Sequence, residues 1–192
     1  MELEHVNVKL LVKDPDEVSL DPLIPVFHSW IEGQVLEELL LDVADYRHVH
    51  AGPGVILIGH EANYSVDNTE ARLGVRYNRK AALEGSNQDR LRHAMRAALN
   101  ACQRLEMEPS LEGTLQFGGQ EMEFFVNDRL LAPNCDTTRE EVHSEFEAFF
   151  EKLFRGSQYS LSYASDPRRL FGVSVKSSQS FTTADLLANL DA

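Results

Sequence analysis

Alternating apolar and polar positions predict a series of β-strands. From His5 to Lys13, valines and leucines alternate with mainly polar residues, which is typical of a half-buried strand. Strands are predicted over residues 5–13, 43–49, 55–58, 72–80, 159–163 and 171–175. Residues 114–126 are expected to form a hairpin that turns at Gly118-Gly119. The chain is therefore rich in strands joined by short turns.

Apolar residues at helical spacing predict three main helices. Residues 23–31 carry one apolar stripe behind Asp21-Pro22, a helix-starting pair, and Gly33 follows as a stop. A second stripe covers 91–105. A third helix is expected to begin at the capping-box pair Thr138 and Glu141 and to end before Gly156.

The order of these elements predicts an α+β fold. The predicted order is β-α-β-β-β-α-β-β-α-β-β, in which most neighbouring strands are joined without a helix. That order favours a largely antiparallel β-sheet with the three main helices packed in a two-layer arrangement. Residues 1–176 are expected to form a single domain. Residues 177–192 form a C-terminal tail that could add a short helix, docked either on its own domain or on a partner.

Composition and charge narrow the class of protein. The 192 residues are 43% hydrophobic and carry a net charge of −13, which disfavours nucleic acid and anionic membranes as partners. The two cysteines, Cys102 and Cys135, have no metal-binding spacing and suit a reducing compartment. No signal peptide or membrane span is visible, so we expect a cytoplasmic protein.

Basic residues concentrate in one part of this acidic chain. The segment 72–104 holds eight basic and two acidic residues, a net charge of +6. Arg72, Arg76 and Lys80 are predicted to share one face of a strand, where arginine forks could bind the phosphate or carboxylate of a small anionic molecule. Alternatively, the basic segment meets acidic surface within the monomer or across a homo-oligomer.

Histidines cluster around a predicted turn at Pro53. Pairing across that turn would place His48, His50 and Glu61 on one sheet face, where they could bind a metal ion. Histidines exposed beside a turn are the alternative.

The same pairing places a carboxylate opposite an imidazole. Asp45 would lie opposite His60 on the other face and could activate it as a catalytic base. A simple polar pair between strands explains the same residues.

No motif in the sequence fixes a reaction or a cofactor. We expect a non-catalytic binding or assembly protein that forms a homo-oligomer. A metal-assisted hydrolase built on His48, His50 and Glu61 is one alternative. A protein that binds an anionic small ligand through Arg72 and Arg76 is the other.

Overall fold

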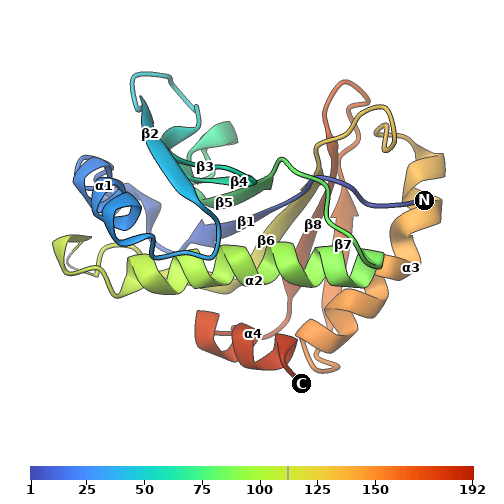
Figure 1. Cartoon of the computed structure of the whole chain (residues 1–192). Coiled ribbons are helices and arrows are strands. Elements are labelled where there is room, and N and C mark those ends of the chain that lie inside the picture. Colours follow the sequence, from blue (N-terminus) through green and yellow to red (C-terminus); the bar gives the residue numbers. More distant parts are fainter. Residues whose placement is uncertain (112) are drawn as a thin grey trace.

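An eight-stranded antiparallel sheet organises the molecule (Figure 1). The computed structural model describes residues 1–111 and 113–192. The strands lie in the order β2-β3-β4-β5-β1-β6-β8-β7, so β1 is central and β2 and β7 are the edges. The strands are β1 Val6–Val12, β2 Leu40–Tyr46, β3 Gly54–Gly59, β4 Ala62–Asp67, β5 Gly74–Arg79, β6 Phe117–Val126, β7 Tyr159–Tyr163 and β8 Phe171–Ser177.

The helices cover one face of this sheet. The α-helices are α1 Leu23–Gly33, α2 Asn87–Glu106, α3 Asp136–Leu153 and α4 Thr183–Leu190. The long helix α2 lies along β1 and β5, and α1 lies beside β2 (Figure 1). On the other wing, the ring of Phe124 on β6 meets Phe146, Phe149 and Phe150 of α3 edge-on. These contacts confirm the α+β class and the two-layer arrangement.

The C-terminal tail packs on its own domain. Helix α4 contacts α2, α3 and β6, and its Leu186 is fully buried. The carboxylate of Asp191 pairs with Arg96 at 2.6 Å, and Asn189 donates to the carbonyl of Leu153. Within the described residues, four α-helices form the helical layer: the three main helices predicted and the short helix that the tail could add.

The sequence analysis missed one strand and wrongly predicted a hairpin in place of another. Residues 62–67 form β4, which the sequence did not predict. Residues 117–126 form one strand, β6, in place of the predicted hairpin. The Gly118-Gly119 pair is extended there, and a Cβ atom on Gly119 would lie 2.5 Å from the carbonyl oxygen of Phe181. Glycine is thus required by the close approach of the tail and not by a turn.

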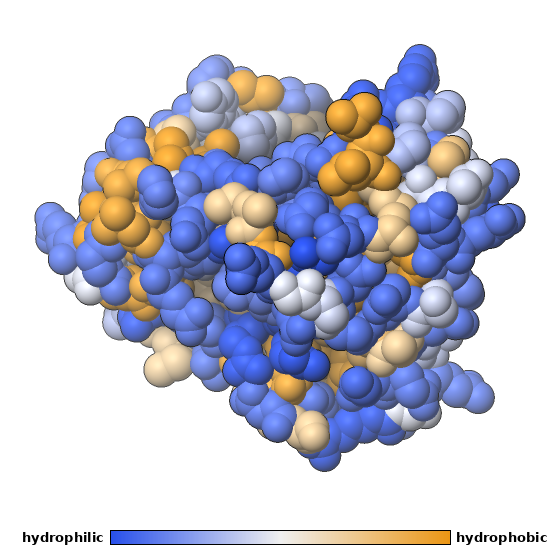
Figure 2. Space-filling model, turned by 45° about the vertical axis from the view of Figure 1, so that its right-hand side comes forward, coloured by the Kyte–Doolittle hydropathy of each residue, from blue (hydrophilic) through white to orange (hydrophobic). Residues whose placement is uncertain are grey.

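The surface of one side of the molecule is mostly polar. On the side shown in Figure 2, hydrophilic residues cover most of the surface and apolar residues gather in small separate groups. Within the described part of the chain, no helix is both long and apolar enough to cross a bilayer.

Candidate functional site

The sheet face opposite the helices carries a buried polar ladder. Register places Asn63, Asn78 and Asn7 side by side on β4, β5 and β1. The next row on the same face runs through Ser65, Arg76, Lys9 and Glu123. Antiparallel sheets often expose such a face to water. Here Asn7 and Lys9 are 0% and 2% exposed.

Connections from opposite ends of the sheet enclose this face. Residues 68–73 leave β4 at one end, and residues 164–170 join β7 to β8 at the other. They meet through an ion pair between Glu70 and Arg169. Glu70 and its neighbour Ala71 both adopt positive φ, at 64° and 58°, a region that non-glycine residues rarely enter. Strained backbone of this kind clusters at functional sites.

Lys9 is held beneath these connections by a buried ion pair. Its ammonium lies 2.5 Å from the carboxylate of Asp67 and donates to the carbonyl of Thr69. Burial lowers the pKa of Lys9, although the carboxylates of Asp67 and Glu123 act in the opposite direction. Asp67 also accepts bonds from the backbone and hydroxyl of Thr69, which orders the start of the connection to β5.

Arg76 lies in the middle of this face without a carboxylate partner. None of the ion pairs among the described residues includes Arg76, and its Nε is buried with no hydrogen-bond acceptor. Its guanidinium stacks 4.8 Å from the ring centre of Phe125. Burial lowers the pKa of Arg76, and the carboxylates of Asp67 and Glu123 oppose that shift from a distance. Arginine nevertheless keeps its charge in proteins.

A cavity of about 230 Å³ borders Arg76, and we call it the cationic pocket. Its charged lining consists of five cations and two carboxylates, Lys9, Arg76, Arg129, Arg168, Arg169, Glu70 and Glu123. Both carboxylates are engaged, Glu70 by Arg169 and Glu123 by Arg72. Within the described chain, Arg76 and Arg129 have no carboxylate in ion-pair contact, so the pocket keeps an excess of positive charge.

The three residues predicted to bind an anion are divided by the structure. Arg72 is neutralised by Glu121 and Glu123 on β6. Lys80 lies beyond the far end of β5 and donates to the carbonyl of Gly59. Of the three, only Arg76 lines the cationic pocket.

The predicted pairing across Pro53 was wrong, and the residues grouped by it lie apart. The reversal occupies residues 47–53 and pairs Asp45 with Val55 and Val43 with Leu57. His48 and His50 are exposed in this loop, and Glu61 follows the opposite end of β3. The structure therefore does not bring His48, His50 and Glu61 together. No group of three potential metal ligands occurs among the described residues.

Asp45 and His60 are likewise separated. Hydrogen bonds from the Arg47 side chain and backbone hold the pKa of Asp45 at about 2. His60 lies past the end of β3, where its backbone N–H donates to the carbonyl of Leu39. Asp45 therefore cannot orient His60 as a base.

Sequence reasoning missed most of the cationic pocket. Lys9 was expected on the polar face of its strand, but its burial was not foreseen. Arg129, Arg168 and Arg169 lie in connections whose position depends on tertiary contacts. The Asp-Pro-Arg-Arg run at 166–169, a turn signal followed by two cations, was the one local signal.

Fold and pocket together define an antiparallel α+β protein with a cationic pocket on the sheet face away from its helices. No protein-family model matches the chain, and no curated protein matches it in sequence at a significant level.

Proposed function

We propose that this protein binds a small molecule carrying a phosphate or carboxylate group in the cationic pocket. The observation that supports this proposal most directly is that the guanidinium of Arg76 is largely removed from water and has no anionic partner among the described residues. Burying an unpaired charge is costly, and an anion at hydrogen-bonding distance offsets that cost. The proposal is of a binding protein and includes no catalytic step.

The surroundings of Arg76 favour a planar or tetrahedral oxyanion. Phe125 covers one face of the guanidinium, which leaves the in-plane N–H groups free to donate in a fork. Arg129, Arg168 and Arg169 border the same cavity and are exposed, so they can steer an anion inward. The cavity volume of about 230 Å³ suits a small ligand.

Three asparagines lie in the row next to Lys9 and Arg76 on the same face of the sheet. The side chains of Asn7, Asn63 and Asn78 have buried atoms with no hydrogen-bond partner among the described residues. Buried polar atoms normally find partners, in water or in a ligand. The three amides do not line the cationic pocket, so the proposed ligand is assigned no contact with them.

Thermal unfolding with defined anions tests this proposal. Inorganic phosphate, succinate and glucose 6-phosphate serve as probes at constant ionic strength, with glucose as the uncharged control. A ligand at 100 times its Kd stabilises the native state by about 2.7 kcal/mol. For a chain of this size we expect a rise in Tm of roughly 5–10 °C. The proposal fails if no anion raises Tm more than glucose does.

A matched pair of variants locates the binding. Arg76→Gln removes the central positive charge of the cationic pocket, and we expect it to abolish the anion-dependent rise in Tm. Arg92→Gln removes an arginine from the outer surface of α2, where Arg92 pairs with Asp89, and should leave the rise in Tm intact. Equal responses of the two variants would place the anion elsewhere.

A second candidate, homo-oligomer assembly, is favoured by the β2 edge. Leu39 and Leu41 are 56% and 51% exposed at one end of this edge strand, and Tyr46 and Val49 are exposed at the other. An exposed apolar edge strand can form backbone hydrogen bonds with a strand of a second chain. Light scattering behind size exclusion should detect a dimer that Leu41→Lys dissociates. A protein that is still monomeric at about 200 μM would exclude this homo-oligomer.

A further inference from the structure

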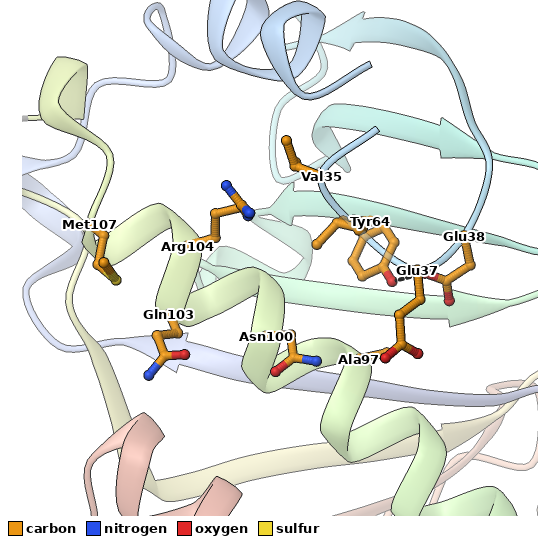
Figure 3. A pocket seen from close by; sticks show the side chains of 10 residues that line it. Val35, Glu37, Glu38, Tyr64, Ala97, Asn100, Gln103, Arg104 and Met107 are labelled. Atoms are coloured by element: carbon orange, nitrogen blue, oxygen red, sulfur yellow. Dashed lines mark hydrogen bonds between the residues drawn. The ribbon is translucent and has the colours of Figure 1, made fainter. Parts of the chain in front are cut away.

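A second cavity lies on the opposite side of the sheet, between α2 and the segment that joins α1 to β2. Its volume is about 520 Å³. Val35 and Leu36 of the connecting segment, Ala97 of α2 and the ring of Tyr64 on β4 supply apolar walls. Glu37 and Glu38 lie together on one side, as Figure 3 shows. The cavity is therefore amphipathic, with its carboxylates gathered in one part.

Glu38 is the unusual residue of this cavity. It is 8% exposed, and one of its carboxylate oxygens accepts a hydrogen bond from the hydroxyl of Tyr64. The other oxygen, Oε1, is buried with no partner among the described residues. A carboxylate so far removed from water normally has all its strong acceptor sites engaged. Glu38 thus offers a free acceptor to a molecule in the cavity.

Neighbouring cations do not satisfy Glu38. A neighbouring cavity of about 270 Å³ is also lined by Glu37 and Glu38 and borders Arg79 and His93. Arg79 is engaged by Glu61 at 3.0 Å and by the carbonyls of two nearby alanines. Burial and the charge of Arg79 lower the pKa of His93, so its ring is neutral at pH 7.

We propose that this cavity binds an organic amine as its ammonium cation. The ammonium would donate to Oε1 of Glu38, with Glu37 adding negative charge beside it. Its hydrocarbon stem would lie on Val35, Leu36 and Ala97. The guanidinium of Arg104 lies in another part of the cavity from these carboxylates (Figure 3). It stacks 6.0 Å from the ring centre of Trp30. A second cationic group there would be repelled, so the structure favours monoamines over diamines.

Methionine methyl resonances give a direct binding test. Met107 borders the cavity, whereas Met122 is buried in β6 on the other wing of the sheet. The full-length protein, labelled at its methionine methyl carbons, is titrated with butylammonium chloride and, separately, with 1-butanol. Met107→Leu assigns the reporting signal. We expect butylammonium to shift the Met107 resonance saturably, butanol to bind at least about tenfold more weakly, and Met122 to stay unchanged.

Two variants of different kinds test the role of Glu38. Glu38→Gln keeps an acceptor for the Tyr64 hydroxyl but removes the charge, and should weaken butylammonium binding about tenfold or more. Ala97→Phe fills the cavity from the half-buried surface of α2 without altering Glu38, and should also abolish binding. The control Glu147→Gln changes an exposed carboxylate on α3 and should bind as the unaltered protein does.

The binding results distinguish an amine site from an apolar cavity. Saturable ammonium binding that Glu38→Gln weakens, that Ala97→Phe abolishes and that the α3 control retains supports the proposal. Equal binding of butylammonium and butanol would show a merely apolar cavity and overturn it. An unchanged affinity in Glu38→Gln, or no shift of Met107 at any probe concentration, would overturn it as well. None of these results depends on the cationic pocket, because that pocket lies on the other face of the sheet.

Discussion

The Lys9–Asp67 ion pair allows a stability prediction whose magnitude follows from burial. Both residues are 2% exposed, and the charged atoms lie 2.5 Å apart. Lys9→Met keeps the length and most of the volume of the side chain but removes its charge. Asp67 would then remain buried next to the strained connection at Glu70, and among the described residues only Thr69 would still donate hydrogen bonds to it.

Breaking one half of a buried ion pair costs about 3–5 kcal/mol, because the remaining charge is left without compensation. Adding Asp67→Asn removes that charge and preserves an acceptor for the Thr69 backbone. We therefore expect the double variant Lys9→Met/Asp67→Asn to recover most of the loss. The two changes should be strongly non-additive, as expected of residues in direct contact.

Urea unfolding followed by far-UV circular dichroism measures this effect. For a urea m-value near 2 kcal/mol/M, roughly that of a chain this size, Lys9→Met should lower the midpoint by about 1.5–2.5 M. Arg92→Met, which breaks an exposed pair with Asp89, is the control and should cost about 1 kcal/mol or less. A loss below about 1 kcal/mol for Lys9→Met, or a double variant no more stable than the single one, would refute the reasoning.

Two further predictions concern the C-terminal tail. Leu186→Ala should lower the free energy of unfolding in urea by about 2–5 kcal/mol, because this side chain of α4 is fully buried. A loss below about 0.5 kcal/mol, the size expected of a surface change, would mean that the tail does not pack in solution. Hydrogen bonds from the side chain and backbone of Thr182 lower the pKa of Asp185. The stability that Asp185 contributes is therefore present above pH 3.8, the ordinary value, and is lost as pH falls through its lowered pKa. Asp185→Asn should flatten the fall of Tm with pH below 3.8, and a Tm profile parallel to that of the unaltered protein would contradict this assignment.

Local patterns predicted the class of the fold because each strong period corresponds to a real element. The helix of residues 87–106 begins at Ser86, whose side chain accepts from the backbone of Asp89 in a full capping box. The alternation of residues 6–12 is the central strand β1. The strand of residues 62–67 was missed although apolar Ala62, Tyr64 and Val66 alternate with polar residues there in the same pattern that predicted β1.

Register lay beyond what the sequence could provide. The Ala51-Gly52-Pro53-Gly54 run looks like a hairpin turn, yet the chain reverses over the whole of residues 47–53. Gly54 has φ of 65°, and a Cβ atom there would lie 2.0 Å from the carbonyl oxygen of Val66. Glycine is therefore required at position 54 because β3 lies too close to β4 there for a side chain. Moving the reversal changed which residues face each other, and the predicted histidine grouping depended entirely on that register.

Alternation also says which side chains share a face but not whether water reaches that face. Arg76 was correctly placed opposite the apolar side of its strand, and nothing in its neighbours along the chain indicates that residues 68–73 and 164–170 close over it. Once they do, each polar group beneath them needs a partner. Lys9 has Asp67, and Glu123 has Arg72. Among the described residues, Arg76 has neither a carboxylate partner nor water-exposed surface for its Nε, which is why the proposed anion site is centred on it.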